Sequence, residues 1–439
     1  MKFLAIVLGK IAYLLGKMIG RGSDMPGRVA LKIDKNILKK IKFPEIRIIV
    51  TGSSGKGSTT AVIANVLKKN GVRVCYNSSG ANMASGIIST ILGECSLGGK
   101  INADAVLFEM DERNTKFVYQ SMKPTHVLIT NLTKDQPPRQ HDVDFILSEI
   151  LKNINDEAVL ITNMDDPFMR NIEKKVPNKV EYYSIASNKY SYKDQLFENL
   201  IINHCPDCGA LLKYDYYNIE TLGKYSCPNC DFKYIKPKFY GEDMDLENGT
   251  LNINGSMVKI GGDMIYYAYN TMAAYSMLST LNLGIDVAGS INSINDYKPN
   301  YFEAYGRKFY NLSCKAENAS TYNQVVYKSY CVPGLKDYVI GWLEISRRYV
   351  HFDLSWLYDV EFELFNDSNL NKIYCCGIDA DNIKKRLLIA GIDEAKIVTA
   401  IDIPSIKSDV LADKVDAVCG VLNFDYCAPF DETFRGGEA

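Results

Sequence analysis

The stretch of sequence that decides the fold is Thr51-Gly-Ser-Ser-Gly-Lys-Gly-Ser-Thr59, a glycine- and serine-rich turn with one lysine. An apolar, β-rich run, Ile46–Val50, precedes this turn, and a helical stretch, Thr59–Asn70, follows it. A strand, a glycine-rich turn and a helix in this order are typical of a phosphate-binding loop. Backbone N–H groups and the positive end of the helix surround phosphate oxygens, and the lysine reaches the terminal phosphates. The sequence therefore predicts a nucleotide-binding site in an α/β fold.

This turn, called the phosphate loop below (residues 51–59), also has to supply a hydroxyl for Mg²⁺. The residues expected to hold the phosphates and the ion are Gly52, Gly55, Lys56, Gly57, Ser58 and Thr59. In such loops the hydroxyl usually follows the lysine directly. Gly57 fills that position here, so the hydroxyl has to come from Ser58 or Thr59. The alternative, an ordinary glycine–serine turn, leaves the strand, lysine and helix together unexplained.

Short apolar runs alternate with helical stretches after the loop. These runs are Val72–Tyr76, Ala105–Phe108, His126–Thr130 and Ala158–Thr162. The alternation predicts parallel strands in βαβ units. Each run ends in polar residues: Asn77, Glu109 with Asp111, Asn131 and Asn163. Ligands of open α/β sheets bind at the carboxyl ends of the strands, so we expect Glu109 to bind magnesium opposite the phosphates.

The chain has 439 residues, enough for two or three domains. We expect a basic segment over residues 1–44 and a central nucleotide-binding domain with a parallel sheet over 45–299. A smaller, Rossmann-like α/β domain is expected over 300–439, after the turn-rich segment Asp296–Arg307. Its expected strands are Tyr338–Leu343, Lys372–Cys376, Lys396–Ala400 and Ala417–Leu422.

Two C-x2-C pairs, Cys205–Cys208 and Cys227–Cys230, are separated by 18 residues. This spacing predicts a zinc ribbon, inserted over residues 203–236, with four thiolates around a structural Zn²⁺. The eight other cysteines are expected to be free thiols in a reducing, cytoplasmic compartment. Residues 205–232 contain two lysines and four acidic residues, and the whole chain carries a net charge of −2. Both balances argue against a nucleic-acid partner.

The first forty residues are basic, with nine Lys or Arg, two Asp and a local charge of +7. Residues 3–19 are apolar but interrupted by Lys10 and Lys17, which excludes a typical signal peptide, and the chain has no unbroken apolar stretch long enough to span a membrane. Two interpretations stay open. A helix could rest on an anionic membrane surface, at the inner face of the membrane. It could instead dock on its own domain with a solvated basic face, apolar residues such as Phe3 and Ile6 lying away from the lysines.

The motifs, taken in order, resemble the MurT branch of the Mur ligase family, the ligase subunit of lipid II isoglutaminyl synthase. Besides the phosphate loop and the four-cysteine ribbon, the resemblance rests on Gly80-Ala-Asn82-Met-Ala-Ser-Gly86, Glu109-Met-Asp-Glu112, Thr130-Asn131-Leu-Thr-Lys-Asp135-Gln136, Asn163-Met-Asp-Asp166-Pro167 and Tyr269-Asn270. It covers nearly the whole chain and is thinner beyond residue 275.

The resemblance implies an ATP-dependent carbon–nitrogen ligase of peptidoglycan synthesis. Such a subunit converts the D-glutamate carboxylate of lipid II to an acyl phosphate and amidates it with ammonia from a GatD-type glutaminase partner. By resemblance, Lys56, Ser58 and Thr59 hold the phosphates and magnesium, and Glu109 binds the metal. The further residues implied on the nucleotide side are Asn82, Asn131, Asp166 and Asn270.

The segment Asp353-Leu-Ser-Trp-Leu-Tyr-Asp359 resembles the D-x-S-W segment of the family. The resemblance implies that Asp353 completes the Cys-His pair of the glutaminase, where a carboxylate orients the histidine. Without the resemblance, Asp353 reads as a loop or helix-capping residue. His141, just past Asp135 and Gln136, is expected to be a solvated loop histidine rather than a metal ligand.

Several departures from the family pattern keep two other functions open. Gly57-Ser58, after the lysine of the phosphate loop, is similar to folylpolyglutamate synthases, and Tyr267 stands where the family has an asparagine. Glu317-Asn-Ala-Ser-Thr321 replaces the family's Lys-Asn-Pro-Ala-Gly stretch, and Ile345–Phe352 replaces its polar run before the D-x-S-W segment. A free-standing ligase would add an amino acid to a cell-wall peptide or folate-like acid. A non-enzymatic zinc-ribbon binding module is the third hypothesis.

Overall fold

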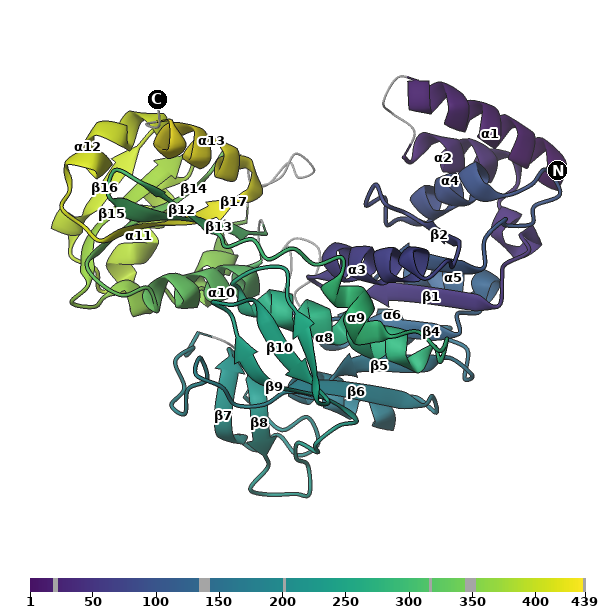
Figure 1. Cartoon of the computed structure of the whole chain (residues 1–439), viewed down its shortest axis with the longest axis horizontal. Coiled ribbons are helices and arrows are strands. Elements are labelled where there is room, and N and C mark those ends of the chain that lie inside the picture. Colours follow the sequence, from purple (N-terminus) through teal and green to yellow (C-terminus); the bar gives the residue numbers. More distant parts are fainter. Residues whose placement is uncertain (19–22, 134–142, 200–202, 316–317, 344–352, 437–439) are drawn as a thin grey trace.

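The computed structural model describes residues 1–18, 23–133, 143–199, 203–315, 318–343 and 353–436. Figure 1 shows three regions: a large sheet with the first helices above it, a small hairpin below it, and a second sheet wrapped by the C-terminal helices. Among the helices that the structure describes, none has both the length and the apolar character needed to cross a bilayer.

The large sheet has nine strands in the order β11-β10-β9-β6-β5-β4-β1-β3-β2. Its strands are β1 (Ile46–Thr51), β2 (Val74–Tyr76), β3 (Ala105–Glu109), β4 (His126–Ile129), β5 (Val159–Asn163), β6 (Val180–Ile185), β9 (Phe239–Asp245), β10 (Thr250–Ile253) and β11 (Ser256–Lys259). The strands from β2 to β9 pair in parallel, and only β10 and β11 are antiparallel. The predicted parallel sheet is therefore confirmed.

Helices cover both faces of this sheet. They are α1 (Lys2–Met18), α2 (Met25–Ile33), α3 (Lys56–Lys69), α4 (Ala84–Glu94), α5 (Thr115–Met122), α6 (Val143–Leu151), α7 (Pro167–Arg170), α8 (Ile265–Thr280) and α9 (Val287–Asn292). Successive residues of β1 point to opposite layers: Ile49 packs with α4 to α6, whereas Ile48 and Val50 pack with α3 and α8. A strand buried on both faces reads as a continuous apolar run, which is what residues 48–50 show.

The second sheet has six strands in the order β12-β13-β17-β14-β15-β16. Its elements are β12 (Tyr301–Ala304), β13 (Arg307–Cys314), α10 (Ala319–Tyr330), β14 (Lys336–Trp342), β15 (Leu370–Gly377), α11 (Ala380–Ile389), β16 (Ile397–Ala400), α12 (Lys407–Ala412), β17 (Ala417–Asn423) and α13 (Phe424–Arg435). All four predicted strands are present. The domain boundary near residue 300 stays a prediction. The strands of the large sheet come before this residue in the sequence, and those of the second sheet come after it.

The turn-rich segment before this sheet contains more structure than its sequence indicates. Residues 301–304 form β12, which pairs antiparallel with β13. Tyr305 and Gly306, at the turn, have positive φ values of 51° and 71°. Two successive left-handed residues match the twist of a two-residue hairpin. The polar composition of this segment therefore predicted the turn correctly but gave no indication of β12, the strand before it.

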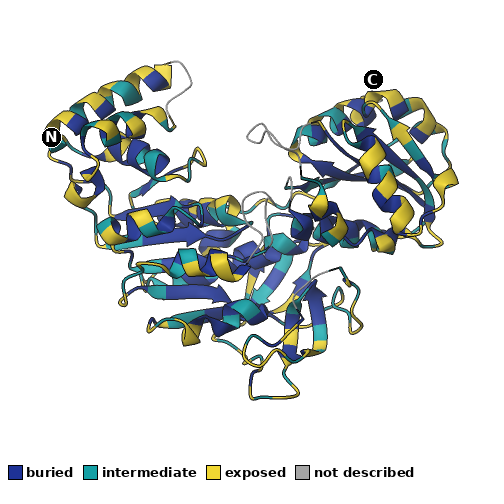
Figure 2. Cartoon of the chain, turned by 180° about the vertical axis from the view of Figure 1, so that it is seen from behind, coloured by how far each residue is buried: buried dark blue, intermediate teal, exposed yellow. Residues whose placement is uncertain are grey.

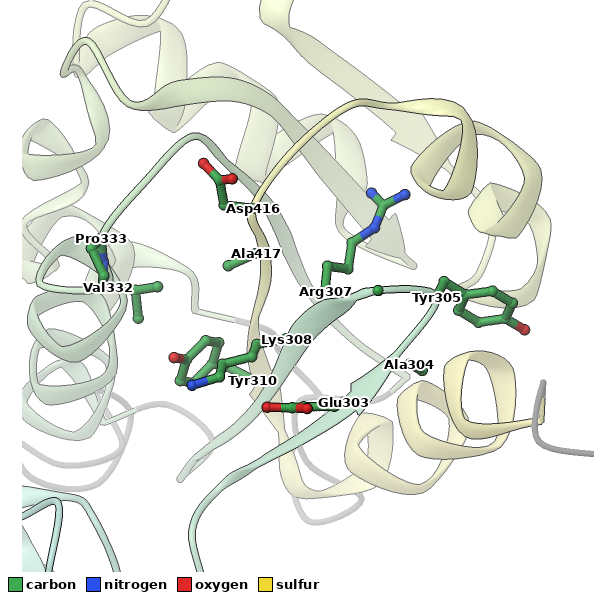
Figure 3. Close-up of a pocket in the computed structure, with 11 residues that line it drawn as sticks. Glu303, Ala304, Tyr305, Arg307, Lys308, Tyr310, Val332, Pro333, Asp416 and Ala417 are labelled. Carbon is green, nitrogen blue, oxygen red and sulfur yellow. The ribbon is translucent and has the colours of Figure 1, made fainter.

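A pocket of about 630 Å³ lies beside this hairpin and is lined by Glu303, Arg307, Lys308 and Asp416 among others (Figure 3). Arg307 and Ala417 begin β13 and β17, so the pocket lies at the amino ends of parallel strands. Ligands of α/β sheets bind at the carboxyl ends. The pocket is therefore at the opposite end of the sheet from the strand end that approaches the phosphate loop.

Candidate active site

The phosphate loop lies where the strand order of the large sheet reverses. β1 pairs with β3 on one side and with β4 on the other, so the polar residues that follow these three strands meet at one edge. Thr51 Oγ1 donates to the carbonyl of Met110 at 3.1 Å, and Thr130 N donates to the Thr51 carbonyl at 2.9 Å. This reversal point is the expected ligand crevice of a doubly wound sheet.

Two glycines let the loop pass close to its neighbours. Gly52 and Gly55 have φ values of 129° and 76°. A Cβ on Gly52 would lie 2.3 Å from Thr130 Oγ1, and one on Gly55 would lie 2.3 Å from Asn270 Oδ1. Backbone without side chains at these points leaves N–H groups open to a ligand. The loop therefore fits the phosphates of a nucleotide.

Lys56, the first residue of α3, is held by an acidic partner. Its Nζ donates to Glu112 Oε1 at 2.9 Å and to the carbonyl of Gly52. Both side chains are largely buried, with exposed fractions of 11 % for Lys56 and 6 % for Glu112. A buried cation with one carboxylate partner can exchange that partner for a phosphate. Sequence analysis singled out Lys56 and Glu109 but not this pairing.

Glu109, at the end of β3, faces the start of α3. Its Oε1 accepts a hydrogen bond from Asn82 Nδ2 at 3.3 Å. Asn77 holds the backbone of Glu109 by two hydrogen bonds: Asn77 Nδ2 donates to the Glu109 carbonyl at 2.8 Å, and Glu109 N donates to Asn77 Oδ1 at 2.9 Å. Burial raises the pKa of Glu109, while Lys56 and the Asn82 hydrogen bond act in the opposite direction. A Cβ on Gly57 would lie 3.3 Å from Glu109 Oε2. Gly57 is thus the residue that faces the carboxylate.

The two hydroxyls proposed for magnesium lie differently. Ser58 is exposed, whereas Thr59 is fully buried and its Oγ1 has no hydrogen-bond partner in the part of the chain that the structure describes. Carboxylate oxygen is a preferred Mg²⁺ ligand. The assignment of Glu109 and Ser58 as the magnesium ligands stays a prediction.

We expect Glu109→Gln to lower ATP turnover by about 10²-fold and to raise the Mg²⁺ concentration needed for half-maximal rate, because it removes a charged ligand. Ser58→Ala should cost less, because an exposed hydroxyl is readily replaced by water. Titrating Mg²⁺ against the initial rate of ADP release measures both. Equal losses in the two variants would contradict this ranking.

Asn131 forms the second wall of the loop. Its Oδ1 accepts from Ser54 N at 2.9 Å, and its Nδ2 donates to the Ser54 carbonyl at 3.1 Å. Because both polar atoms of its amide are used, Asn131 supports the loop shape. Asn270, on α8, lies against Gly55. Asn82, Asn131 and Asn270 thus all reach the loop or Glu109, and direct contacts with a nucleotide stay a prediction.

Asp166 has a different local role. Its Oδ1 accepts from Phe168 N at 2.8 Å and so caps α7. Burial raises the pKa of Asp166 to about 6 and that of its neighbour Asp165 to about 7. Asp165 Oδ2 accepts from Tyr269 OH at 2.8 Å, which ties this turn to α8. This hydrogen bond makes Asp166 a capping residue, and its role on the nucleotide side stays a prediction.

Lys315 joins the site from the other sheet. It follows β13, and its Nζ donates to the carbonyl of Ser53 in the phosphate loop at 2.9 Å. Its charge also opposes the rise in the pKa of Glu109 that burial causes. Asn318, which caps α10, donates to Thr133 Oγ1 at 3.2 Å. Sequence analysis missed Lys315; the only available signal was a lysine two positions before Glu317, where the family has its lysine.

We expect Lys315→Met to lower ATP turnover by about 10- to 100-fold, because a second cation beside the phosphates is lost and the contact between the two sheets weakens. Lys308→Met, at the other end of β13, is the matched control and should be neutral. Steady-state kinetics with varied ATP measures both. Wild-type kinetics in the Lys315 variant would remove this residue from the site.

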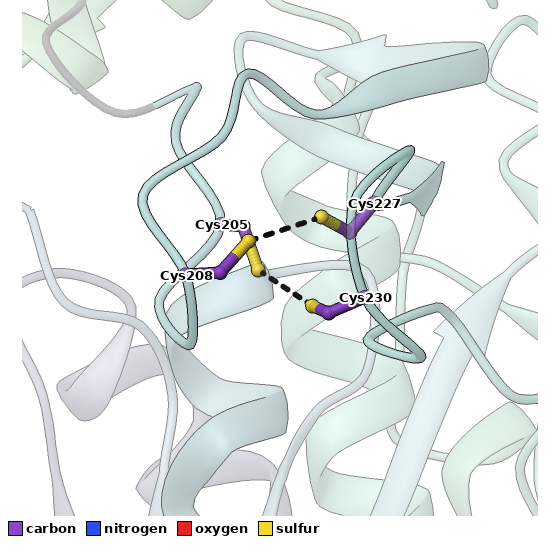
Figure 4. A group of neighbouring side chains, drawn as sticks. All are labelled: Cys205, Cys208, Cys227 and Cys230. Carbon is purple, nitrogen blue, oxygen red and sulfur yellow. Dashed lines mark hydrogen bonds between the residues drawn. The ribbon is translucent and has the colours of Figure 1, made fainter.

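The four cysteines of the ribbon lie together beside the hairpin of β7 (Lys213–Ile219) and β8 (Leu222–Ser226) (Figure 4). Their sulfur atoms all lie within 4.8 Å of one another, with 3.6 Å between Cys205 and Cys230 and 3.5 Å between Cys208 and Cys227. Four thiolates about 2.3 Å from a tetrahedral Zn²⁺ would be about 3.8 Å apart. The cluster therefore fits a closed, structural zinc site.

The tip of the ribbon hairpin connects the two sheets. Glu220, at the tip, is buried against α10, where Ser320 Oγ donates to Oε2 and Asn323 Nδ2 donates to Oε1 at 3.1 Å. Burial raises the pKa of Glu220 to about 7. The ribbon thus takes part in holding the C-terminal sheet over the phosphate loop.

Glu220 should make stability depend on pH. Its pKa is about 7 in the folded protein against 4.5 normally, so its contribution is fully present below pH 4.5 and is lost as pH rises through 7. In wild type, the free energy of unfolding should therefore fall by on the order of 2 kcal/mol between about pH 5 and pH 8. We expect Glu220→Gln to abolish this fall, because glutamine does not titrate. Thermal unfolding across that range tests this, with the exposed Glu94→Gln as control. Parallel pH profiles of wild type and Glu220→Gln would contradict it.

Asp353 lies two residues before a short 3-10 helix, Ser355–Asp359, and its Oδ1 accepts from Ser355 N at 2.8 Å. Trp356 is buried between Tyr322 and Trp342, with ring centroids 4.7 and 5.5 Å away. This packing fixes the position of Asp353 on the C-terminal sheet. The local contact is the capping role expected from sequence without the resemblance, and the partner role stays a proposal.

Some residues singled out in the sequence lie outside the described part of the chain. They are Asp135, Gln136, His141, Glu317 and the segment 345–352.

Two families match the sequence. The profile of the Mur ligase middle domain matches residues 50–229, and that of the MurT ligase C-terminal domain matches residues 345–421. The MurT subunit of lipid II isoglutaminyl synthase (glutamine-hydrolyzing) from Staphylococcus aureus strain COL is 30 % identical, over 99 % of both chains. The corresponding subunit of Streptococcus pneumoniae R6 is 26 % identical, over 90 % of this chain and 88 % of that one.

Solved structures share the fold. A pseudomurein peptide ligase type C from Methanothermus fervidus has a TM-score of 0.67 at 17 % identity, covering 91 % of this chain and 80 % of that one. MurF from Acinetobacter baumannii has a TM-score of 0.62 at 14 % identity, covering 92 % and 80 %. MurF of Thermotoga maritima in complex with ADP has a TM-score of 0.57 at 17 % identity, covering 93 % and 81 %.

Proposed function

The chain belongs to the MurT branch of the Mur ligase family and is an ATP-dependent carbon–nitrogen ligase, and from this premise we propose that it amidates the D-glutamate carboxylate of lipid II. The nitrogen would be ammonia released by a GatD-type glutaminase partner. ATP and Mg²⁺ are the proposed cofactors at the phosphate loop, and Zn²⁺ at the four-cysteine cluster.

One observation carries the proposal. Lys56, at the start of α3, and Lys315, just after β13 of the second sheet, both donate to carbonyls of the phosphate loop, and Glu109 lies beside them. Two cations and a carboxylate, contributed by both α/β units, would suit the transfer of the terminal phosphoryl group of ATP to an acceptor. A module that only binds zinc needs no such arrangement, so the non-enzymatic hypothesis is disfavoured.

The reaction that fits this site has two displacements. A carboxylate oxygen of the acceptor attacks the terminal phosphorus of ATP, the bond to the bridging oxygen breaks, and ADP leaves. Ammonia then attacks the acyl carbon, inorganic phosphate leaves, and the nitrogen loses a proton to give the amide. Lys56 would move from Glu112 to the transferred phosphoryl group, whose negative charge it offsets. Mg²⁺, when bound, supplies further charge neutralisation.

The experiment that tests this function combines the purified chain with ATP, Mg²⁺, ammonium and lipid II, with mass spectrometry as readout. Ammonium replaces the partner. Conversion of one carboxyl to an amide supports the proposal. ADP release that depends on an added amino acid, without amide formation, would support instead the free-standing ligase that Gly57-Ser58 favours. Neither product in protein that binds ATP would contradict both.

A further inference from the structure

The first helix, α1, has two faces that are both apolar. The inner face packs on α2 and α4 and buries one large residue, Ile6, with the small residues Ala5, Gly9 and Gly16. A Cβ on Gly9 would lie 2.7 Å from Leu92 Cδ1, so the small residues allow close contact. Lys2 Nζ and Lys10 Nζ donate to carbonyls of the same domain at 2.6 Å. α1 is therefore fixed along its length.

The outer face carries large apolar side chains that point into solvent. They are Phe3, Leu4, Leu8, Ile11, Leu14, Leu15 and Met18, with exposed fractions between 38 % and 83 %. On a helix with 100° per residue these positions form one continuous stripe. Figure 2 shows α1 with a largely exposed outer side above the sheet. The docked helix that sequence analysis considered is thus present, but its free face is apolar rather than basic, and Ile6 is buried.

The segment that carries this stripe has a net positive charge. Residues 1–40 contain nine Lys or Arg and two Asp. Both acidic groups are already paired, Asp24 with Arg28 and Asp34 with Lys40. An exposed apolar stripe on a segment with a net positive charge matches a bilayer surface with anionic lipid headgroups, which takes the apolar side chains below the headgroups and attracts the cations to their level.

We propose that the outer face of α1 docks on an anionic lipid bilayer and holds the enzyme at the membrane surface. Because the inner face is committed to α2 and α4, α1 lies parallel to the bilayer rather than across it. The docking does not depend on the proposed amidation. The docking would place the phosphate loop near an acceptor that is itself a membrane lipid.

Vesicle sedimentation tests the docking in the absence of ATP and acceptor. The full chain is mixed with phosphatidylcholine vesicles or with vesicles that also contain phosphatidylglycerol, and bound protein is measured. We expect binding to the anionic vesicles only, decreasing with added salt. The triple variant Leu8→Ser, Ile11→Ser, Leu15→Ser should bind at least about 10-fold more weakly, because it removes the apolar stripe. The substituted side chains are exposed, so the fold should persist.

The matched control replaces three exposed apolar residues of the C-terminal region: Ile378→Ser, Ile389→Ser and Ile401→Ser. It should bind like wild type. Equal binding of the α1 variant and wild type would overturn the proposal, and so would failure of wild type to bind anionic vesicles. In that second case, a dimer seen by light scattering and lost in the α1 variant would assign the stripe to contact between copies. Amidation of a water-soluble acceptor analogue should be the same in all variants, so a failed docking leaves the proposed function standing.

Discussion

Replacing Lys56 by Ala should lower ATP turnover by at least about 10³-fold, the largest effect on ATP turnover that we expect of a single substitution in the phosphate loop. Lys56 is the only loop residue with a side-chain cation, and its Nζ lies among the Gly52 carbonyl, the Ser53 carbonyl and Glu112 Oε1. Loss of this charge leaves the transferred phosphoryl group without its nearest cation. Initial rates of ADP release, with ammonium and acceptor present, measure the effect.

The variant also leaves Glu112 buried without its cation, which could unfold the protein and mimic lost catalysis. The double variant Lys56→Met, Glu112→Gln removes both charges and separates the two effects. It should fold, as judged by thermal unfolding, and still lack turnover. Lys69→Ala, an exposed lysine at the end of the same helix, is the control. Turnover near wild type in the double variant would remove Lys56 from the reaction.

Replacing Asp353 by Asn should abolish glutamine-driven amidation and spare the reaction with ammonium. An asparagine Oδ1 can still accept the hydrogen bond from Ser355 N that Asp353 makes at 2.8 Å, so the segment keeps its shape and only the charge is lost. If Asp353 orients a histidine of the glutaminase, loss of the charge costs about 10⁴-fold, as in serine proteases. Glutamate release and amide formation, measured in the complex with the partner, give the two rates.

The control for this variant is Asp367→Asn. Asp367 Oδ1 accepts from Asn369 N at 2.9 Å in a turn of the same domain, so it makes the same local contact as Asp353. It should change neither rate. Equal loss of the glutamine-driven and ammonium-driven reactions in Asp353→Asn would indicate a structural residue. Retention of both would leave Asp353 as a capping residue only.

Sequence alone determined the features that depend on near neighbours along the chain. The phosphate loop, the parallel strands around it and the paired cysteines each follow from a short pattern of residue types, because strand pleat, helix start and metal coordination constrain residues a few positions apart. The carboxyl ends of β1, β3 and β4 were expected to meet, since parallel strands align their ends, and the register places Glu109 beside Val50.

Only the tertiary structure determined the contacts between residues that are far apart in the sequence. Lys315 reaches Ser53 over 262 positions, and Glu220 reaches Asn323 over 103 positions, where no local pattern relates the partners. The outward apolar face of α1 was likewise hidden, because periodicity showed an apolar helix but not which side its small residues would present to α4. Local sequence thus defined the phosphate loop (residues 51–59), whereas packing between distant parts of the chain decided which charges surround this loop and which face of α1 stays exposed.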